Sequence, residues 1–153
     1  MSAAPGLRGD ADAVAALLQR RPEGAFEVVV RHRDGTPLVI RNAPLLDDGR
    51  PMPTRYWLVG EPERTIVSRL EADGGVRRAG LAVDADALER AHARYAAERD
   101  AVLVADHADH VGPAHSGGVG GTRVGVKCLH AHYAWFLAGG DDPVGRWVHE
   151  RLT

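Results

Sequence analysis

The 153-residue sequence has a single cysteine, only short apolar runs and no excess of positive charge, and each of these features excludes a class of protein. It contains one cysteine, Cys128, so an internal disulfide is excluded and a reducing compartment is favoured. Its apolar runs are far too short to cross a bilayer, and the first six residues lack the apolar core of a signal peptide. We therefore expect a cytoplasmic protein without membrane insertion.

The chain also has no excess of positive charge. Its formal net charge is −2 and its pI is about 6.4, so it lacks the basic field that usually accompanies nucleic-acid binding. We therefore expect no nucleic-acid partner. All but one of the basic residues are arginines, which leaves Lys127 as the single lysine. Because an ammonium group differs from a planar guanidinium in shape and acidity, Lys127 is a candidate functional residue, with chance as the alternative explanation for a single lysine.

Length and composition are those of an ordinary globular protein. With 44% apolar and 26% charged residues, the chain is large enough to fold without a disulfide or a metal. We expect one domain over residues 1–153, with residues 1–9 as a disordered tail. No cofactor is indicated, and no oligomeric state is predicted.

Residue patterns predict one short helix, then three strands, then several more helices. Strands are expected at Phe26–His32, Pro37–Arg41 and Arg55–Val59. Helices are expected from Asp10 or Asp12 to about Arg20, from Pro62 to Asp73, from Asp84 or Asp86 onward, from about Val124 to Ala138, and after Asp142-Pro143. The predicted fold is α+β, a small antiparallel sheet of about three strands packed against several, mainly C-terminal, helices.

The segment GGVGGTRVGVKCLHAH (117–132) is the strongest candidate for a site. A glycine-rich stretch runs into a predicted helix that opens with Lys127 and Cys128. On a helix, Cys128 and His132 are four residues apart and share one face, whereas Lys127 and His130 share another. The first pair lies toward the apolar side and the second toward the polar side.

The polar side is interpreted as an anion site. Backbone N–H groups at a helix N-terminus, together with nearby cations, attract phosphate or carboxylate groups. The expected ligand-binding residues are Gly120, Gly121, Arg123, Lys127 and His130. The expected ligand is small and anionic, most simply a phosphorylated compound. A plain solvated helix face is the alternative.

The apolar pair, Cys128 and His132, is interpreted as a candidate catalytic pair. An imidazole and a helix N-terminus both favour a thiolate, which would serve a small hydrolase or transferase, with His130 as the alternative base. A buried thiol beside a core histidine is the competing interpretation. Zinc bound by Cys128, His132 and one of the histidines at positions 107, 110 and 115 is a further alternative, but we assign no metal ligand.

Four segments together resemble a known family. They are NAPLLDDGRPMPTRYWL (42–58), SRLEA (68–72), VKCLHAH (126–132) and DPVG (142–145). The chain is similar, from about Val14 to Trp147, to a bacterial and largely actinobacterial family known as domain of unknown function 501. For Glu71, within the second segment, we expect a salt bridge or a structural role.

The resemblance implies no established activity. Members of that family often lie near genes for a septum-formation protein and an exopolyphosphatase-like enzyme. This neighbourhood implies a third candidate function, that of a non-catalytic partner of the division or envelope machinery.

Overall fold

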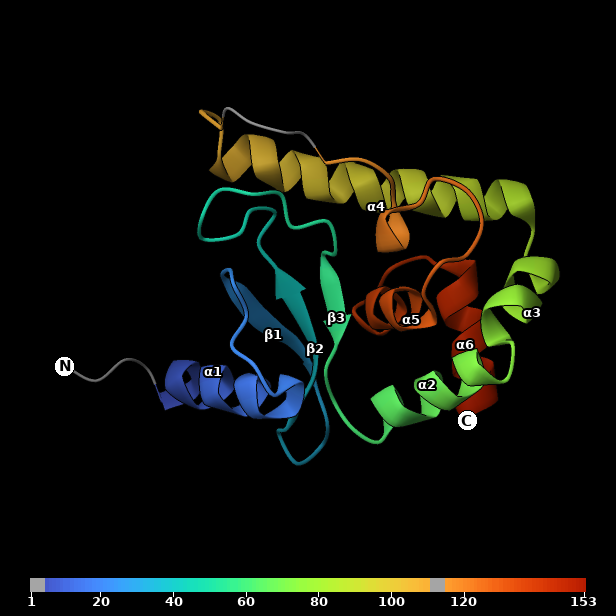
Figure 1. Cartoon of the computed structure of the whole chain (residues 1–153), viewed down its shortest axis with the longest axis horizontal. Helices are drawn as coiled ribbons and strands as arrows, with labels where there is room; N and C mark the ends of the chain where they lie inside the picture. The colour runs from blue at the N-terminus through green and yellow to red at the C-terminus, as the bar shows by residue number, and fades with distance from the viewer. Residues whose placement is uncertain (1–4, 111–114) are drawn as a thin grey trace.

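The computed structural model describes residues 5–110 and 115–153, with side chains described from Gly9 onward. Within these ranges the chain forms a three-stranded antiparallel sheet and six α-helices, five of which follow the sheet in the chain (Figure 1). The predicted α+β class, with mainly C-terminal helices, is confirmed.

The sheet is formed by β1 (Phe26–Arg31), β2 (Pro37–Asn42) and β3 (Tyr56–Leu58), in that order. Val39 of β2 pairs with Leu58 of β3, and both side chains are buried. All three predicted strands are present, each within two residues of its expected ends.

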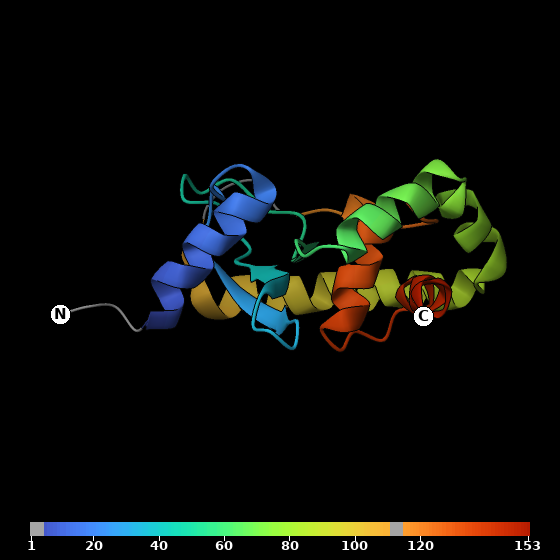
Figure 2. The same cartoon turned by 90° about the horizontal axis from the view of Figure 1, so that it is seen from below.

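The helices are α1 (Pro5–Leu18), α2 (Glu63–Ala72), α3 (Gly75–Ala82), α4 (Ala85–Asp106), α5 (Leu129–Leu137) and α6 (Pro143–Leu152), with a 3-10 turn, η1 (Val119–Gly121). The two views place α1 beside the sheet, and α2, α3, α5 and α6 together on the other side (Figures 1 and 2). Helix α4 runs along both halves and joins them.

The capping residues act largely as the sequence predicts. Asp84 accepts a hydrogen bond from the Ala87 N–H at 2.9 Å and starts α4. Asp142 accepts one from the Val144 N–H at 2.9 Å and starts α6, with Pro143 in the first turn. Gly139, at φ +102°, follows α5 as the predicted stop.

Three features of the helices differ from the expectation: the start of α1, the presence of α3 and the start of α5. The backbone of residues 5–9 belongs to α1, so it is not a disordered tail; residues 1–4 lie outside the described residues. Helix α3 was not predicted, because Gly74-Gly75 signals a stop. Gly74, at φ +84°, does end α2, but the chain turns at once into a new helix.

The third difference affects the site. Helix α5 begins at Leu129, not near Val124, because the glycine-rich loop continues through Cys128, which has extended backbone angles. Gly125, at φ +69°, is incompatible with a helix at that point. Val124, the expected start of this helix, lies in the loop instead and is exposed.

The core joins α5 to β3 and α4. Trp135 of α5 is 5% exposed, and its ring packs edge-on against Tyr95 of α4 with 5.2 Å between centroids. The Tyr95 hydroxyl accepts a hydrogen bond from the Arg55 N–H at 2.5 Å, at the start of β3. The predicted packing of a C-terminal helix against the sheet is confirmed by α5, in which Trp135 is buried, whereas Lys127, just before the helix, is exposed.

Trp135→Ala should lower the free energy of unfolding by about 3–5 kcal/mol, because it removes a large buried ring and leaves a cavity. Lys127→Ala is the matched control, since its exposed side chain lies before the same helix and should change stability by less than about 0.5 kcal/mol. Denaturant titration measures both values. A small loss for Trp135→Ala would contradict the packing of α5 described above.

Candidate functional site

A cleft of about 490 Å³ lies where α1, β3, α2, η1 and the start of α5 meet. Its lining combines apolar, aromatic and cationic side chains with one thiol. The lining residues are Leu18, Arg20, Thr54, Tyr56, Trp57, Leu58, Arg64, Ser68, Gly120, Cys128, His130 and Ala131.

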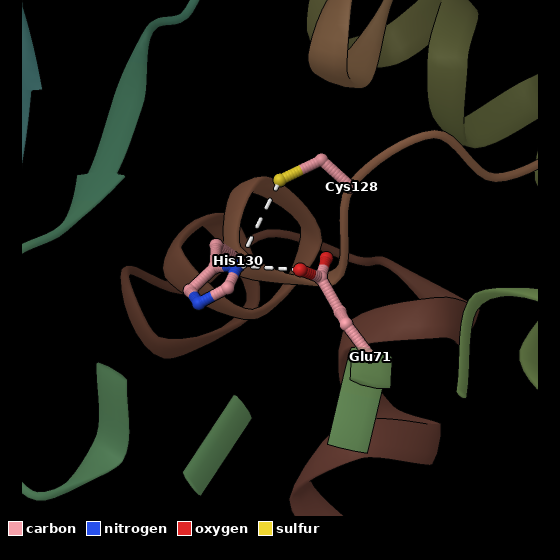
Figure 3. Close-up of side chains that lie close together, drawn as sticks. All are labelled: Glu71, Cys128 and His130. Carbon is pink, nitrogen blue, oxygen red and sulfur yellow. Dashed lines mark hydrogen bonds and ion pairs between the residues drawn. The ribbon is translucent and has the colours of Figure 1, made fainter. Parts of the chain in front are cut away.

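Three side chains converge beside this cleft, as Figure 3 shows: Cys128 and His130, which line it, and Glu71, which does not. The Nδ1 atom of His130 lies 3.2 Å from Oε1 of Glu71 and 4.0 Å from Sγ of Cys128. All three side chains are half-buried. The cluster therefore brings a carboxylate, a thiol and an imidazole within reach of one small ligand.

Glu71 also determines where α5 begins. Its second oxygen, Oε2, accepts a hydrogen bond from the Leu129 N–H at 2.8 Å. Cys128, the residue before α5, makes no capping bond through its own side chain to any described residue. Glu71, from the end of α2, therefore supplies the cap from outside the helix and fixes the orientation of its own carboxylate.

The other nitrogen of His130 faces α2. His130 Nε2 lies 3.0 Å from Ser68 Oγ and 3.2 Å from the Arg64 carbonyl oxygen. The Ser68 hydroxyl itself donates to the same carbonyl at 3.0 Å, so both neighbours accept a hydrogen bond from the ring. Nε2 is therefore the protonated nitrogen, and Nδ1 faces the thiol and the carboxylate.

The charge state of His130 reflects these neighbours. Burial lowers the pKa of the imidazole, but its hydrogen bond to Cys128 and the negative charge of Glu71 outweigh burial. The pKa of His130 therefore lies above its ordinary value.

His132 does not pair with Cys128. It is fully buried, and its Nδ1 lies 2.6 Å from Oδ2 of Asp142, which is also fully buried. The pairing predicted from helical spacing is wrong because Cys128 precedes the helix, so the partner of the thiol is His130. His132 instead joins α5 to the capping residue of α6.

The glycine-rich loop is held by a histidine of α4. His92 Nδ1 accepts a hydrogen bond from the Val119 N–H at 3.1 Å, and Nε2 lies 2.8 Å from the Gly125 carbonyl oxygen. A Cβ atom at Gly118 would come within 2.6 Å of His92 Cβ, and one at Gly117 within 2.3 Å of the Gly121 carbonyl oxygen. These two glycines are therefore needed for the packing of the loop itself.

The five predicted anion-binding residues do not converge. His130 and Gly120 line the cleft, but Lys127 and Gly121 line a separate hollow near Pro51 and His115, which Gly120 also borders. Arg123 borders a third hollow, beside Arg99 and His92. The cations of the cleft are Arg20 and Arg64 instead.

Sequence reasoning missed the contribution of α2. Arg64, Ser68 and Glu71 follow the spacing i, i+4, i+7, which places polar side chains on one face of a helix. That spacing is visible in the sequence, and it marks the face that meets His130. The partner of that face is set by tertiary packing.

Neither the alternative zinc set nor a membrane span is present among the described residues. Cys128 is grouped with Glu71 and His130, and the described histidines at 107, 110 and 115 are not part of that group. None of the helices in residues 5–110 and 115–153 is long and apolar enough to cross a bilayer.

Comparison with known proteins identifies one family. The sequence model described as "Protein of unknown function (DUF501)" matches residues 28–150, which include the sheet from Val28, all of α2 to α5 and most of α6. No curated protein and no solved structure matches the chain.

Stability should fall in acid because of His92. Burial lowers its pKa despite the hydrogen bond to Gly125, so the folded state holds a neutral ring while the unfolded chain takes up a proton below about pH 6.5. His132, Asp142 and Glu89 are the charged or titratable groups that also act on it. The stabilisation from neutral His92 is thus complete above the unfolded pKa and is lost as the pH falls below it.

The test is the free energy of unfolding of the wild type and of His92→Asn between about pH 7.5 and 5.5. The asparagine carbonyl can still accept the loop N–H but does not titrate. The variant should show a shallower decline with acid than the wild type. Parallel curves would contradict a lowered pKa for His92.

Proposed function

We propose that this chain, which belongs to the family of proteins of unknown function (DUF501), binds a small phosphorylated ligand in the cleft. The charge of the lining carries the proposal. Arg20 and Arg64 line the cleft together with the imidazole of His130, whose pKa is raised, and no carboxylate side chain does so among the described residues. In a chain of net charge −2, this local cationic character favours an anion.

The rest of the lining suits an organic body attached to that anion. Tyr56, Trp57, Leu58 and Leu18 provide apolar and aromatic surface beside the polar groups. The Arg20 guanidinium lies over the Trp57 ring, 5.3 Å from its centroid, which holds a cation next to an aromatic wall. Apolar walls with a few polar groups are typical of small-molecule sites.

The arginines, more than the helix N-terminus, supply the attraction in this proposal. Glu71 already occupies the Leu129 N–H and places its own negative charge at the start of α5. A ligand phosphate is therefore better placed toward Arg20 and Arg64, whose guanidinium groups carry several N–H donors. One of these donors, on Arg64 Nη1, already binds the Leu17 carbonyl oxygen at 3.0 Å. This moves the expected anion from the glycine-rich loop to the cleft.

A phosphorylated ligand at about 100 times its Kd should stabilise the fold by about 2.7 kcal/mol. For a domain of this size, that raises Tm by about 5–10 °C. Arg20→Gln should remove most of the rise. Arg21→Gln is the matched control, because Arg21 is a neighbouring exposed arginine outside the cleft lining.

The measurement is thermal unfolding with pyrophosphate and with a panel of phosphate monoesters. Lys127→Gln should keep the rise, because Lys127 lines a different hollow. Loss of the rise in Lys127→Gln but not in Arg20→Gln would place the anion at the glycine-rich loop and refute binding in the cleft.

The contact between Cys128 and His130 favours a second candidate function, a thiol-dependent hydrolase or transferase. The thiol lines the cleft, lies 4.0 Å from His130 Nδ1 and precedes the positive end of α5. An imidazole beside a thiol can take up its proton when the sulfur attacks a substrate. Cys128 would be the nucleophile and His130 its acid–base partner.

Under this second function, iodoacetamide should modify native Cys128 faster than it modifies the thiol of the unfolded chain at the same neutral pH. His130→Gln should slow the native reaction, because it removes the imidazole beside the sulfur. Mass spectrometry over a time course gives both rates. A native thiol that reacts only upon unfolding would exclude the nucleophile.

A further inference from the structure

We propose that Glu71, Cys128 and His130 together bind one Zn²⁺ ion at the wall of the cleft. The three side chains offer one oxygen, one sulfur and one nitrogen, which are the donor atoms that zinc takes in proteins. They come from two elements, α2 and the start of α5, that lie far apart in the sequence. This proposal shares His130 with the phosphate proposal above but does not depend on Arg20 or Arg64.

The spacing of the donor atoms fits a tetrahedral ion. Two ligand atoms of one zinc ion lie about 3.3 Å apart for nitrogen and oxygen and about 3.6 Å apart for sulfur and nitrogen. The corresponding separations here are 3.2 Å between His130 Nδ1 and Glu71 Oε1, and 4.0 Å between His130 Nδ1 and Cys128 Sγ. All three donor atoms lie within 4.8 Å of one another. Small side-chain shifts suffice to surround an ion.

The hydrogen bonds around the cluster point the donor atoms inward. His130 Nε2 faces the Arg64 carbonyl and the Ser68 hydroxyl, so the proton of a neutral ring resides there and the Nδ1 lone pair faces the cluster. A zinc-bound histidine ordinarily donates its second N–H to a carbonyl or carboxylate in this way. Glu71 is oriented similarly, because one oxygen accepts from Leu129 and leaves the other for the cluster.

A metal ion would satisfy all three donor atoms at once. With a neutral His130, the unprotonated Nδ1 faces a carboxylate oxygen, and the S–H group of Cys128 is only a weak hydrogen-bond donor to either of them. Zinc replaces the S–H proton and takes the nitrogen, the oxygen and the sulfur as its ligands. Protonation of Nδ1 is the alternative, in which the imidazole donates to Glu71 and no metal is bound.

The site would leave one coordination position for the cleft. Three protein ligands with a fourth, open position are typical of catalytic zinc, whereas structural zinc is enclosed by four. Both Cys128 and His130 line the cleft, so the open position would face the space proposed for the ligand. This distinguishes the site from a purely structural metal.

The first experiment measures metal in the full chain, produced without a histidine tag in zinc-supplemented medium. Elemental analysis should give about one zinc per chain. After removal of zinc with a chelator, Co²⁺ should produce a thiolate-to-cobalt charge-transfer band and the intense visible absorption of a tetrahedral site. A wild type that holds no zinc and gives no thiolate band with Co²⁺ would overturn the proposal.

Variants then assign the ligands. Cys128→Ser, His130→Gln and Glu71→Gln should each lose zinc, and Glu71→Gln keeps an oxygen to accept the Leu129 N–H, so its fold should persist by circular dichroism. Ser68→Ala, beside the ring, should weaken binding by about 10–100-fold. Zinc retained at wild-type affinity in Glu71→Gln or His130→Gln would refute the ligand set.

The matched controls are Asp73→Asn, an exposed carboxylate two residues after Glu71, and the double variant His107→Asn/His110→Asn. Both should keep zinc; loss of zinc in the double variant would assign the metal to the histidine-rich segment instead.

Arg20→Gln should also keep zinc, so this proposal and that of phosphate binding fail separately. Zinc should slow the alkylation of Cys128, and a chelator should restore the rate. A thiol that binds no zinc would instead react at the same rate in zinc and in chelator.

Discussion

The hydrogen bond from the Leu129 N–H to Glu71 is the interaction on which the site depends. It ends the glycine-rich loop, starts α5 and attaches that helix to the last turn of α2. Cys128 is the N-cap residue, so its backbone is extended, and its sulfur faces His130. One carboxylate thus positions a helix with one oxygen and takes part in a chemical cluster with the other. The cleft, the thiol and the imidazole all take their places from this bond.

Much of the fold could be predicted because its signals are local. Asp84 and Asp142 precede their helices and cap them through their own side chains, and Gly139 ends α5 with a left-handed backbone. The start of α5 could not be predicted, because no residue near Leu129 in the sequence caps it. Similarly, Gly74-Gly75 carries the local signal of a stop, while the immediate start of α3 depends on close packing of Gly75 against Leu70.

The difference between local signals and tertiary packing also explains which parts of the candidate site could be predicted. The sequence located Cys128 and His130, but the four-residue spacing that paired the thiol with His132 holds only inside a helix, and Cys128 lies outside it. His132 has a core role, since it meets Asp142 in a fully buried pair that joins α5 to α6. The glycines also have a different explanation: Gly117 and Gly118 allow the loop to pack on itself and on His92.

The hydrogen bond between Glu71 of α2 and Leu129 of α5 also affects the motion of α5. Leu129 and Glu71 are 58 residues apart, and α5 has nine residues, too few to be stable as a helix alone in water. The cluster therefore exists only while α5 is docked, and any brief undocking separates its members and exposes the one sulfur of the cleft to solvent. An ion or ligand that bridges the two helices favours the docked state by mass action. Binding of such an ion or ligand and local unfolding of α5 are therefore thermodynamically linked, because each opposes the other.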